Sequence, residues 1–356
     1  MTLSIITINY NNAEGLRKTL ASVASQTYAE IEHIIIDGGS SDNSVEVIRE
    51  YEYSLASRLC GGGENARGDL GCSSPLVSRL KWISEKDTGI YNAMNKGLEI
   101  ALGRRIVNED HTSSPMANNQ SPIAKTDYIQ ILNSGDILAA PDVTERMMDA
   151  LEAQQVKGER LEAKGEENGK ADTPASTPYT LHSTPTDTSS PYQNRPAILY
   201  GNMIKVNAAG KVVGRSGYTE YSLRQFYSST LNHDCAYIRK DLFEEYGLYD
   251  ENLKIVSDWK WYLQAIGLGR VKPEYVDIDV TIFDDGGISE TNLALRNKER
   301  RQVLEELLPP AVLWDYDTHA FEMEQMNRLR KWKLYPIVYF MERVLFKFEK
   351  WGVLKR

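Results

Sequence analysis

The stretch LSIITINYNNAEGLRKTLASVASQTYAEIEHIIID, residues 3–37, predicts the architecture of this protein. It begins with the alternating apolar run LSIITINY and ends with the nearly continuous apolar run IEHIIID. Between them, Leu16, Leu20 and Val23 share one face of a helix. Alternation at every second residue indicates a strand, and recurrence at every third or fourth residue indicates a helix. The order strand, helix, strand predicts a βαβ unit and a mainly parallel sheet.

The alternation of strands and helices continues beyond residue 37. Asp42 or Asn43 can cap a helix with the sequence VEVIREYE. The segment KWISEKDTGIYNAMNKGLEIALG predicts a short strand, a turn and a helix whose apolar stripe begins at Ile90 and which ends at Gly103. The later segment AILYGNMIKVNAAGKVVGRS predicts two strands joined by a turn at residues 208–210.

Three segments interrupt this order, at about residues 53–80, 104–126 and 153–196. They are rich in Gly, Ser, Thr, Pro, Lys and Glu and lack apolar periodicity. Such compositions cannot bury enough apolar surface to offset the entropy lost on ordering. We therefore expect surface insertions that are partly disordered.

The composition excludes several classes of protein. A net charge of −9 argues against a general nucleic-acid binder, which would normally be basic. Cys60, Cys72 and Cys235 have no metal-type spacing, so we expect neither a zinc site nor a disulfide framework. This cysteine usage predicts a reducing compartment. The N-terminus enters a strand without a basic region or cleavage site, which predicts no signal peptide. No apolar run reaches the roughly 18–20 residues that span a bilayer.

Acidic side chains follow the predicted strands or precede the predicted helices. If the sheet is parallel, the first three of these turns emerge at its carboxyl edge, where open α/β sheets bind ligands. Carboxylates gathered there repel one another unless a cation or hydroxyl groups lie among them. Mg²⁺ together with a ribose-bearing diphosphate meets both needs. The acidic residues are Asp37 and Asp42, Glu85 and Asp87, Asp136, and Asp258.

Several stretches, in this order, resemble the family 2 glycosyltransferases with the GT-A fold. They are SIITINYNNAEGLRKTLASV, IIIDGGSSDNS, SEKDTGIYNAMNKG, YIQILNSGDIL, LYGNMIKVNAAGKVVG, HDCAYIRKDLFEEYGLYDENLKIVSDWKWYL and FDDGGIS. The resemblance is strongest to bacterial enzymes of polysaccharide and lipopolysaccharide assembly. It covers residues 1–295 in segments and implies an α/β fold: a GT-A domain, Rossmann-like, with a mainly parallel mixed sheet flanked by helices. Residues 296–356 would form a C-terminal helical extension.

The resemblance implies which residues bind the donor. The end of the first strand and the following Asp would hold the base and ribose, and the SEKDTGIYNAMNKG turn would hold the rest of the donor. Asp37 could instead be a simple turn former, and Asp87 could cap the helix that begins near Ile90. The implied donor-binding residues are Thr7, Asn9, Asp37, Glu85, Asp87 and Gly89, with Asn92 and Lys96 nearby.

Asp136 falls where the family places a metal-binding Asp-x-Asp motif. Here the turn is Asn133-Ser134-Gly135-Asp136, so only the last acid is present. The resemblance implies that Asp136 binds a divalent metal, Mg²⁺ or Mn²⁺, with much of the affinity supplied by the donor diphosphate. The preceding three residues would contact the donor. The alternative is a plain surface turn, since Asn, Ser, Gly and Asp favour turns.

The resemblance also implies a general base at Asp258. Inverting transfer needs a carboxylate that takes the acceptor proton while a metal neutralises the departing diphosphate. Asp258 could also cap the helix WKWYLQAI, and both roles are compatible. His233 lies where the family often has a His near the diphosphate, although a lone His is often structural. Gly286 and Gly287 in FDDGGIS would form a flexible loop at the acceptor mouth, or an ordinary turn.

The last 30 residues differ from the rest of the chain. From Asn327 to Arg356 there are nine Lys or Arg and two Glu, with seven aromatic residues interleaved. Basic and aromatic residues at helical spacing predict a helix that lies on a membrane surface. The alternative is a helix that packs on the catalytic domain.

We therefore expect an inverting glycosyltransferase of cell-surface polysaccharide synthesis. It would move a sugar from a nucleotide-sugar donor, most simply UDP-linked, to a glycan or lipid-linked acceptor. It would be cytoplasmic, peripheral on the inner face of the cell membrane, and would bind no nucleic acid. A nucleotidyltransferase is disfavoured because NYNNAEGLRK contains a single Gly and so forms no Gly-rich phosphate loop. A non-catalytic sugar-nucleotide binding or scaffold protein is disfavoured because Asp136 and Asp258 are retained.

Overall fold

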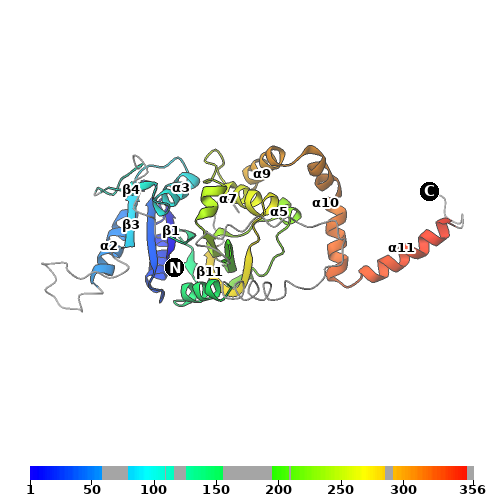
Figure 1. The fold of residues 1–356 in the computed structure, drawn as a ribbon, viewed down its shortest axis with the longest axis horizontal. Helices are drawn as coiled ribbons and strands as arrows, with labels where there is room; N and C mark the ends of the chain where they lie inside the picture. The colour runs from blue at the N-terminus through cyan, green and yellow to red at the C-terminus, as the bar shows by residue number, and fades with distance from the viewer. Residues whose placement is uncertain are drawn as a thin grey trace, which may run out of the picture. The chain divides into compact units, whose positions relative to one another are not determined.

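The structure of the protein is a computed structural model. It describes residues 1–57, 79–108, 110–115, 126–154, 195–207, 210–284 and 292–350. The chain forms two compact units, residues 1–296 and residues 297–356. The first unit is built on a sheet and the second is helical (Figure 1).

Nine strands in the described residues form one mixed sheet, in the order β3-β2-β1-β6-β10-β8-β11-β7, with β9 paired to β8. Strands β3, β2, β1 and β6 are mutually parallel, and β10 runs antiparallel to both of its neighbours. The expected mainly parallel mixed sheet is confirmed. The strands are β1 (Leu3–Asn9), β2 (Ile31–Asp37), β3 (Leu80–Ser84), β6 (Tyr128–Asn133), β7 (Ile137–Leu138), β8 (Ile198–Val206), β9 (Val212–Arg215), β10 (Ala236–Arg239) and β11 (Glu274–Asp284).

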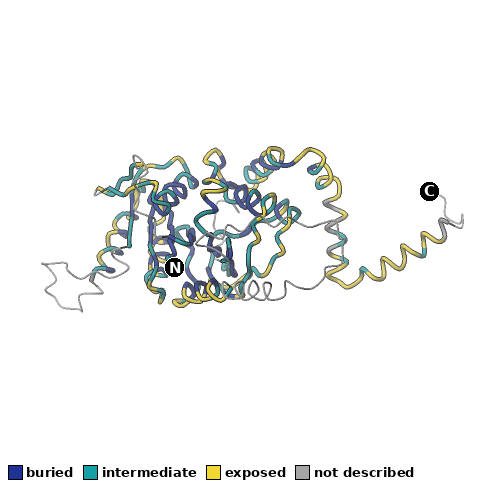
Figure 2. Tube along the Cα trace, in the orientation of Figure 1, coloured by how far each residue is buried: buried dark blue, intermediate teal, exposed yellow. Residues whose placement is uncertain are grey.

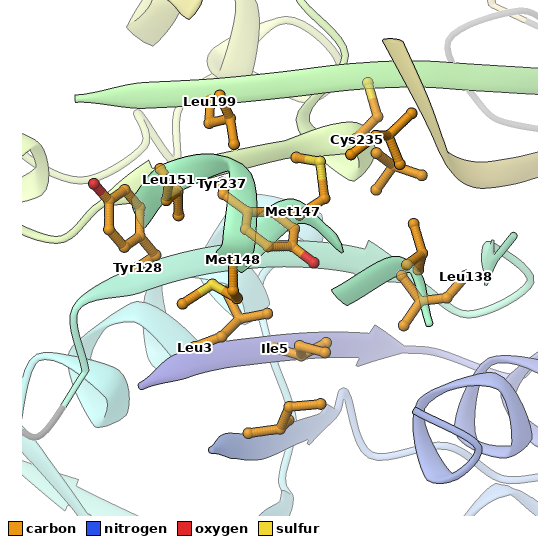
Figure 3. Packing of buried hydrophobic residues seen from close by; sticks show 14 of the residues in the cluster. Leu3, Ile5, Tyr128, Leu138, Met147, Met148, Leu151, Leu199, Cys235 and Tyr237 are labelled. Carbon is orange, nitrogen blue, oxygen red and sulfur yellow. The ribbon is translucent and has the colours of Figure 1, made fainter. Parts of the chain in front are cut away.

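Helices pack on both faces of the parallel half of the sheet. Successive side chains of a strand point to opposite faces. Leu3 and Ile5 of β1 therefore join a core with the helix over residues 143–154, part of which is shown in Figure 3. On the same side, α1 (Ala13–Ala24) and α2 (Ser44–Ser57) pack on β2 and β3.

Helix α3 (Ile90–Ala101) covers the opposite face. It approaches the sheet closely because Gly97 has no side chain: a Cβ there would lie 2.4 Å from Ile6 Cγ2. The predicted end of this helix is also observed, since Gly103 follows it with φ +69°.

Shorter helical elements complete the first unit. They are α5 (Leu223–Ser228), the 3₁₀ turn η2 (His233–Cys235), α6 (Asp241–Glu245), α7 (Ser257–Tyr262) and the π-helical turn η3 (Leu263–Leu268). Two of them carry expected site residues, because His233 begins η2 and Asp258 lies in the first turn of α7.

The C-terminal helices are α9 (Leu293–Leu307), α10 (Pro310–Lys331) and α11 (Tyr335–Lys350). Most described side chains of α11 are exposed along its length (Figure 2). Among the helices in the described ranges, none is both long and apolar enough to cross a membrane.

Only parts of the expected insertions fall within the described residues. Residues 58–78, 116–125 and 155–194 lie outside the described residues. Residues 104–115, assigned above to an insertion, instead contain the antiparallel pair β4 (Arg105–Val107) and β5 (Ser113–Pro115). The loop between them packs on the domain because His111 stacks on Trp82, with ring centroids 3.5 Å apart. Composition misses this contact because it is made by a polar segment.

Candidate active site

A cavity of about 900 Å³ lies at the carboxyl ends of the parallel strands. Its wall comes from four turns that are far apart in sequence, together with the starts of η2 and α7. The four turns follow β1, follow β2, precede α3 and follow β6. This is the edge at which open α/β sheets bind ligands.

The ends of β1, β2 and β3 are held in one row beneath the cavity. Asn9 pairs in register with Asp37, and Asp37 with Ser84. Asn9 Nδ2 donates to Asp37 Oδ1 at 2.9 Å, and Ser84 Oγ donates to Asp37 Oδ2 at 2.7 Å. Ser40 donates to both carboxylate oxygens, one bond from its hydroxyl and one from its backbone N–H. Asp37 is fully buried and does not line the cavity, and its hydrogen bonds order the neighbouring strand ends, of which Asn9 does line it.

The turn after β6 carries Asp136 into the cavity wall. Gly135 has φ +114°, a backbone conformation that residues other than glycine rarely adopt. Helix α1 fixes this turn, because Asn12 Nδ2 donates to the Ser134 carbonyl at 2.8 Å and Thr19 Oγ1 donates to the Asp136 carbonyl at 2.7 Å. The turn is thus an ordered part of the site, held by hydrogen bonds to Asn12, the N-cap of α1, and to Thr19.

The Asp136 carboxylate is 4% exposed and has neighbours suited to a cation. Burial, and next the nearby Asp234 carboxylate, raise the pKa of Asp136 to about 7. The backbone N–H and Nδ2 of Asn133 both donate to Asp136 Oδ2, at 3.2 and 3.1 Å. Asn133 Oδ1 is buried and has no hydrogen-bond partner among the described residues. An ionised carboxylate and an unpaired amide oxygen are ligand types that Mg²⁺ and Mn²⁺ accept.

The described residues nevertheless contain no group of three or more His, Cys, Asp or Glu side chains that could hold a metal by themselves. Asp136 would therefore be the main protein ligand, and a bound diphosphate would have to supply further oxygens. The residues present fit a metal that arrives with its donor.

Asp258 is held by two partners on opposite sides. His233 Nδ1 lies 3.2 Å from Asp258 Oδ2, and Tyr91 Oη donates to Asp258 Oδ1 at 2.8 Å. Burial alone would raise the pKa of Asp258, but the bond and charge of His233, with the bond from Tyr91, hold it below its ordinary value. Burial would lower the pKa of His233, yet Asp258 and two further carboxylates raise it to about 9. Asp258 is therefore ionised at neutral pH beside a protonated His233.

His233 also links this pair to the Asp136 turn. Its Nε2 lies 3.3 Å from Asn133 Nδ2, the same amide nitrogen that donates to Asp136. Asp258, His233, Asn133 and Asp136 therefore follow one another along the cavity wall, although a protonated His233 and the Asn133 amide N–H are both donors and do not bond each other. Two carboxylates with opposite pKa shifts thus share one cavity, an arrangement typical of catalytic sites.

The turn before α3 supplies another acidic wall. Asp87 packs so closely on Gly38 that a Cβ there would lie 2.2 Å from Asp87 Oδ2. Asp87 Oδ1 also accepts from the Gly89 N–H at 3.1 Å, which closes a turn just before the helix. Asp87 does not cap α3, because Gly89 is the N-cap residue and no side chain bonds the first turn. Burial raises the pKa of Asp87. The preceding Glu85 turns away from the cavity and pairs with Lys96 at 3.0 Å.

The structure brings most of the expected site residues together. Those that line the cavity are Asn9, Asp87, Gly89, Asn133, Ser134, Gly135, Asp136, His233 and Asp258. Five others do not line it: Thr7, Asp37, Glu85, Asn92 and Lys96. Donor contacts stay predictions for these five and for the nine that line the cavity.

Their placement follows from local packing. Thr7 shares the face of Leu3 and Ile5, and its hydroxyl lies 2.9 Å from His33 Nε2 in the core. Asn92 lies one residue beyond Tyr91 on α3, and its Nδ2 donates to Glu251 at 2.9 Å. Asn92 therefore ties α3 to the loop before α7.

Several residues that the sequence analysis did not single out also line the cavity. They are Tyr10, Asn12, Lys18, Lys86, Thr88, Tyr91, Lys254 and Phe283, among others. Tyr10 directly follows Asn9, and its side chain is 64% exposed. Tyr10, Lys86 and Thr88 could have been predicted, because each is adjacent in sequence to an expected site residue. Phe283 lies just before the FDDGGIS glycines, but Gly286 and Gly287 themselves lie outside the described residues.

Comparisons with known proteins point to one family. Residues 4–60 match the model of glycosyl transferase family 2. An uncharacterised glycosyltransferase of Mycobacterium tuberculosis is 31% identical over 151 residues, which are 42% of this chain and 40% of that protein. A PGL/p-HBAD biosynthesis glycosyltransferase of Mycobacterium bovis is 20% identical over 289 residues, 81% of this chain and 79% of that protein.

A solved structure shares the fold. The crystal structure of S. aureus TarS 1-349 in complex with UDP-GlcNAc superimposes with a TM-score of 0.50 at 14% identity, covering 85% of this chain and 64% of that one. The fold of the first unit is therefore GT-A, a mixed sheet flanked by helices. The chain spans only 40% of the length of the M. tuberculosis relative.

Proposed function

We propose that this chain is a family 2 glycosyltransferase and that it transfers a sugar, with inversion, from a nucleotide-sugar donor to a glycan or lipid-linked acceptor in cell-surface polysaccharide synthesis. The observation that carries the proposal is the shared cavity of Asp258 and Asp136. One carboxylate is ionised and hydrogen-bonded, and the other is buried beside cation-compatible oxygens.

Asp258 is the proposed general base. An ionised carboxylate can take the proton of an acceptor hydroxyl as that oxygen attacks the anomeric carbon. The bond from the anomeric carbon to the diphosphate breaks on the opposite side, so the configuration inverts and a nucleoside diphosphate leaves. His233 and Tyr91 accept no acceptor proton in this scheme, because they serve as hydrogen-bond donors to Asp258.

Asp136 would hold a divalent metal, Mg²⁺ or Mn²⁺, with the Asn133 amide oxygen beside it. When bound, such a metal neutralises charge on the departing diphosphate. The chain itself would hold the donor along the wall formed by Asn9, Gly39 and Asp87. The exposed ring of Tyr10 offers a flat apolar surface for a base, and a UDP-linked donor is the simplest expectation.

The test is a panel of nucleotide sugars scored by nucleoside diphosphate release, with Mg²⁺ or Mn²⁺ and with a lipid-linked or glycan acceptor. We expect release with one donor class, and slow release without acceptor. Binding of a nucleotide sugar without any release would favour the non-catalytic alternative. Release of pyrophosphate from a nucleoside triphosphate and a sugar phosphate would favour a nucleotidyltransferase.

We further propose that α11 places the enzyme on the inner face of the cell membrane. Ile337, Met341 and Leu345 recur at every fourth position and are each more than half exposed. Phe340 is 67% exposed and falls on the same side at 100° per residue. Residues 327–356 have a net charge of +7, whereas the net charge of the whole chain is −9. An apolar stripe beside basic residues fits an anionic lipid surface.

A membrane position suits the proposed chemistry. A soluble nucleotide sugar reaches the cavity from the cytosol, while a lipid-linked acceptor stays in the bilayer. The contact with the bilayer would be made by the apolar stripe of α11.

A further inference from the structure

Three buried tyrosine hydroxyls lie near Asp258, and they differ in what they bond. Tyr91 Oη donates to Asp258 Oδ1 at 2.8 Å. The hydroxyls of Tyr249 and Tyr262 are buried and have no hydrogen-bond partner within the described part of the chain. Burial, and with it the charge of Asp258, raises the pKa of all three. Of these three, Tyr91 alone is bonded to the carboxylate.

Tyr91 lies in the first turn of α3, between Gly89 at the cavity and Asn95 one turn later. It lies two residues after Gly89, whose backbone lines the cavity. One turn later, Asn95 exchanges two hydrogen bonds with the backbone of Tyr249, at 2.9 and 3.0 Å. Tyr249 belongs to the loop that leads to α7 and Asp258. The helix that carries Tyr91 is therefore tied to the loop that precedes the helix of the base.

The two bonds to Asp258 act on different oxygens. His233 holds Oδ2 and Tyr91 holds Oδ1, so the carboxylate plane cannot rotate without loss of one bond. Each oxygen has a second lone pair that can still accept a proton. A carboxylate held in this orientation is preorganised, because it already has the geometry needed to take the proton of the acceptor hydroxyl.

We infer that Tyr91 is a positioning residue for the Asp258 base: its hydroxyl orients the carboxylate toward the acceptor and couples that orientation to the donor-side turn at Gly89. The inference rests on the proposed function, since it assumes that Asp258 takes the acceptor proton. Tyr91 itself passes no proton. Its pKa lies well above 10, so the hydroxyl remains a donor at working pH.

The test compares Tyr91→Phe with Tyr249→Phe. Both changes remove one hydroxyl from the same aromatic cluster, where the two rings lie 5.8 Å apart, but only the first removes a bond to Asp258. We expect Tyr91→Phe to lower kcat roughly ten- to a hundredfold, the scale of losing a hydrogen bond to a charged group, with the donor KM within about twofold. Tyr249→Phe should keep wild-type kcat. In an Asp258→Asn background, Tyr91→Phe should cause no further loss.

Two results would overturn the inference while leaving the proposed function intact. One is wild-type kcat in Tyr91→Phe. The other is an additional loss in the Asp258→Asn background, which would mean that Tyr91 acts through packing. A folding defect in Tyr91→Phe would be recognised separately, because the nucleoside diphosphate affinity and the melting temperature of that variant would fall as well. Failure of the wild type to release nucleoside diphosphate from any donor would overturn the proposed function and this inference with it.

Discussion

His233 Nδ1 lies 3.2 Å from Asp258 Oδ2, although the two residues are 25 positions apart and belong to different helical elements. The pair places a protonated ring against an ionised carboxylate at the cavity wall. A base held in this way is ready at neutral pH, because it needs no prior loss of a proton. The consequences for activity can be measured directly.

Asp258→Asn should lower turnover by about a hundredfold or more, the usual scale for loss of a general base. The amide keeps the shape of the side chain, so nucleoside diphosphate affinity should stay near the wild-type value. Asp277→Asn is the matched control, since Asp277 is 72% exposed on β11 and does not line the cavity. Wild-type turnover in Asp258→Asn would remove this residue from the mechanism.

Asp136→Ala should weaken nucleoside diphosphate binding in the presence of Mg²⁺ or Mn²⁺ and should remove the metal dependence of that binding. The reason is that Asp136 is the main carboxylate available to a metal at the proposed diphosphate position. Calorimetric titration with and without EDTA measures both effects. Full activity and unchanged binding in EDTA-treated wild-type protein would show that the metal assignment is wrong.

The buried His33 should make stability depend on pH. Burial lowers the pKa of His33 to about 3, so the ring is neutral in the folded protein. The unfolded chain takes up a proton near pH 6.5, and stability therefore falls as pH drops from about 6.5 toward 3, by at most about 1.4 kcal/mol per pH unit from this group. Denaturant unfolding at pH 5 and pH 7 should show this difference in the wild type.

His33→Gln supplies the comparison for the pH effect. Other groups also titrate in this range, so the informative quantity is the change in pH dependence between the two proteins. The variant should be less stable at pH 7, because His33 bonds both Thr7 and Tyr51 in the core, yet its stability should change less between pH 7 and pH 5. Equal pH dependence in both proteins would contradict the assigned neutral ring.

The apolar stripe of α11 should bind anionic vesicles. Basic residues attract anionic lipid at roughly 1 kcal/mol each near the surface, and salt screens this attraction. Burial of apolar side chains is not screened, so high salt should release the protein only in part. Sedimentation should therefore separate the full chain from Ile337→Glu/Leu345→Glu and from a chain that ends at Phe321. Val213→Glu, an exposed apolar residue of β9, is the control. Equal, weak binding by all four proteins would indicate that α11 is a structural helix.

Residues 155–194 should be dispensable for the fold. They lie outside the described residues, and their composition has no apolar periodicity. Replacing them with a short Gly/Ser linker should leave the melting temperature and nucleoside diphosphate binding nearly unchanged. A large drop in melting temperature would show that the segment packs against the domain.

Local sequence patterns predicted much of the first unit. The apolar period of residues 3–37 predicted β1, α1 and β2, because the faces of strands and helices repeat over short distances in the chain. The same reasoning predicted α3 and its end at Gly103, and the β8–β9 pair. It missed the β4–β5 pair, since a polar ribbon is held by contacts such as His111 on Trp82, which no local pattern encodes.

For the site, the sequence by itself determined which chemical groups stand at the strand ends, and the parallel order predicted that Asp87 and Asp136 would meet at one edge. Only the tertiary structure decided which groups face the cavity. Asp37 lies beneath it because neighbouring strand ends supply donors to both its oxygens, and Thr7 lies in the core because of its position in the strand pleat. The sequence likewise did not show which residues bond Asp258, since Tyr91 and His233 are 167 and 25 residues away from it in the chain. Hydrogen bonds depend on distance in space, and the chain specifies such distances only once the sheet and its helices have packed.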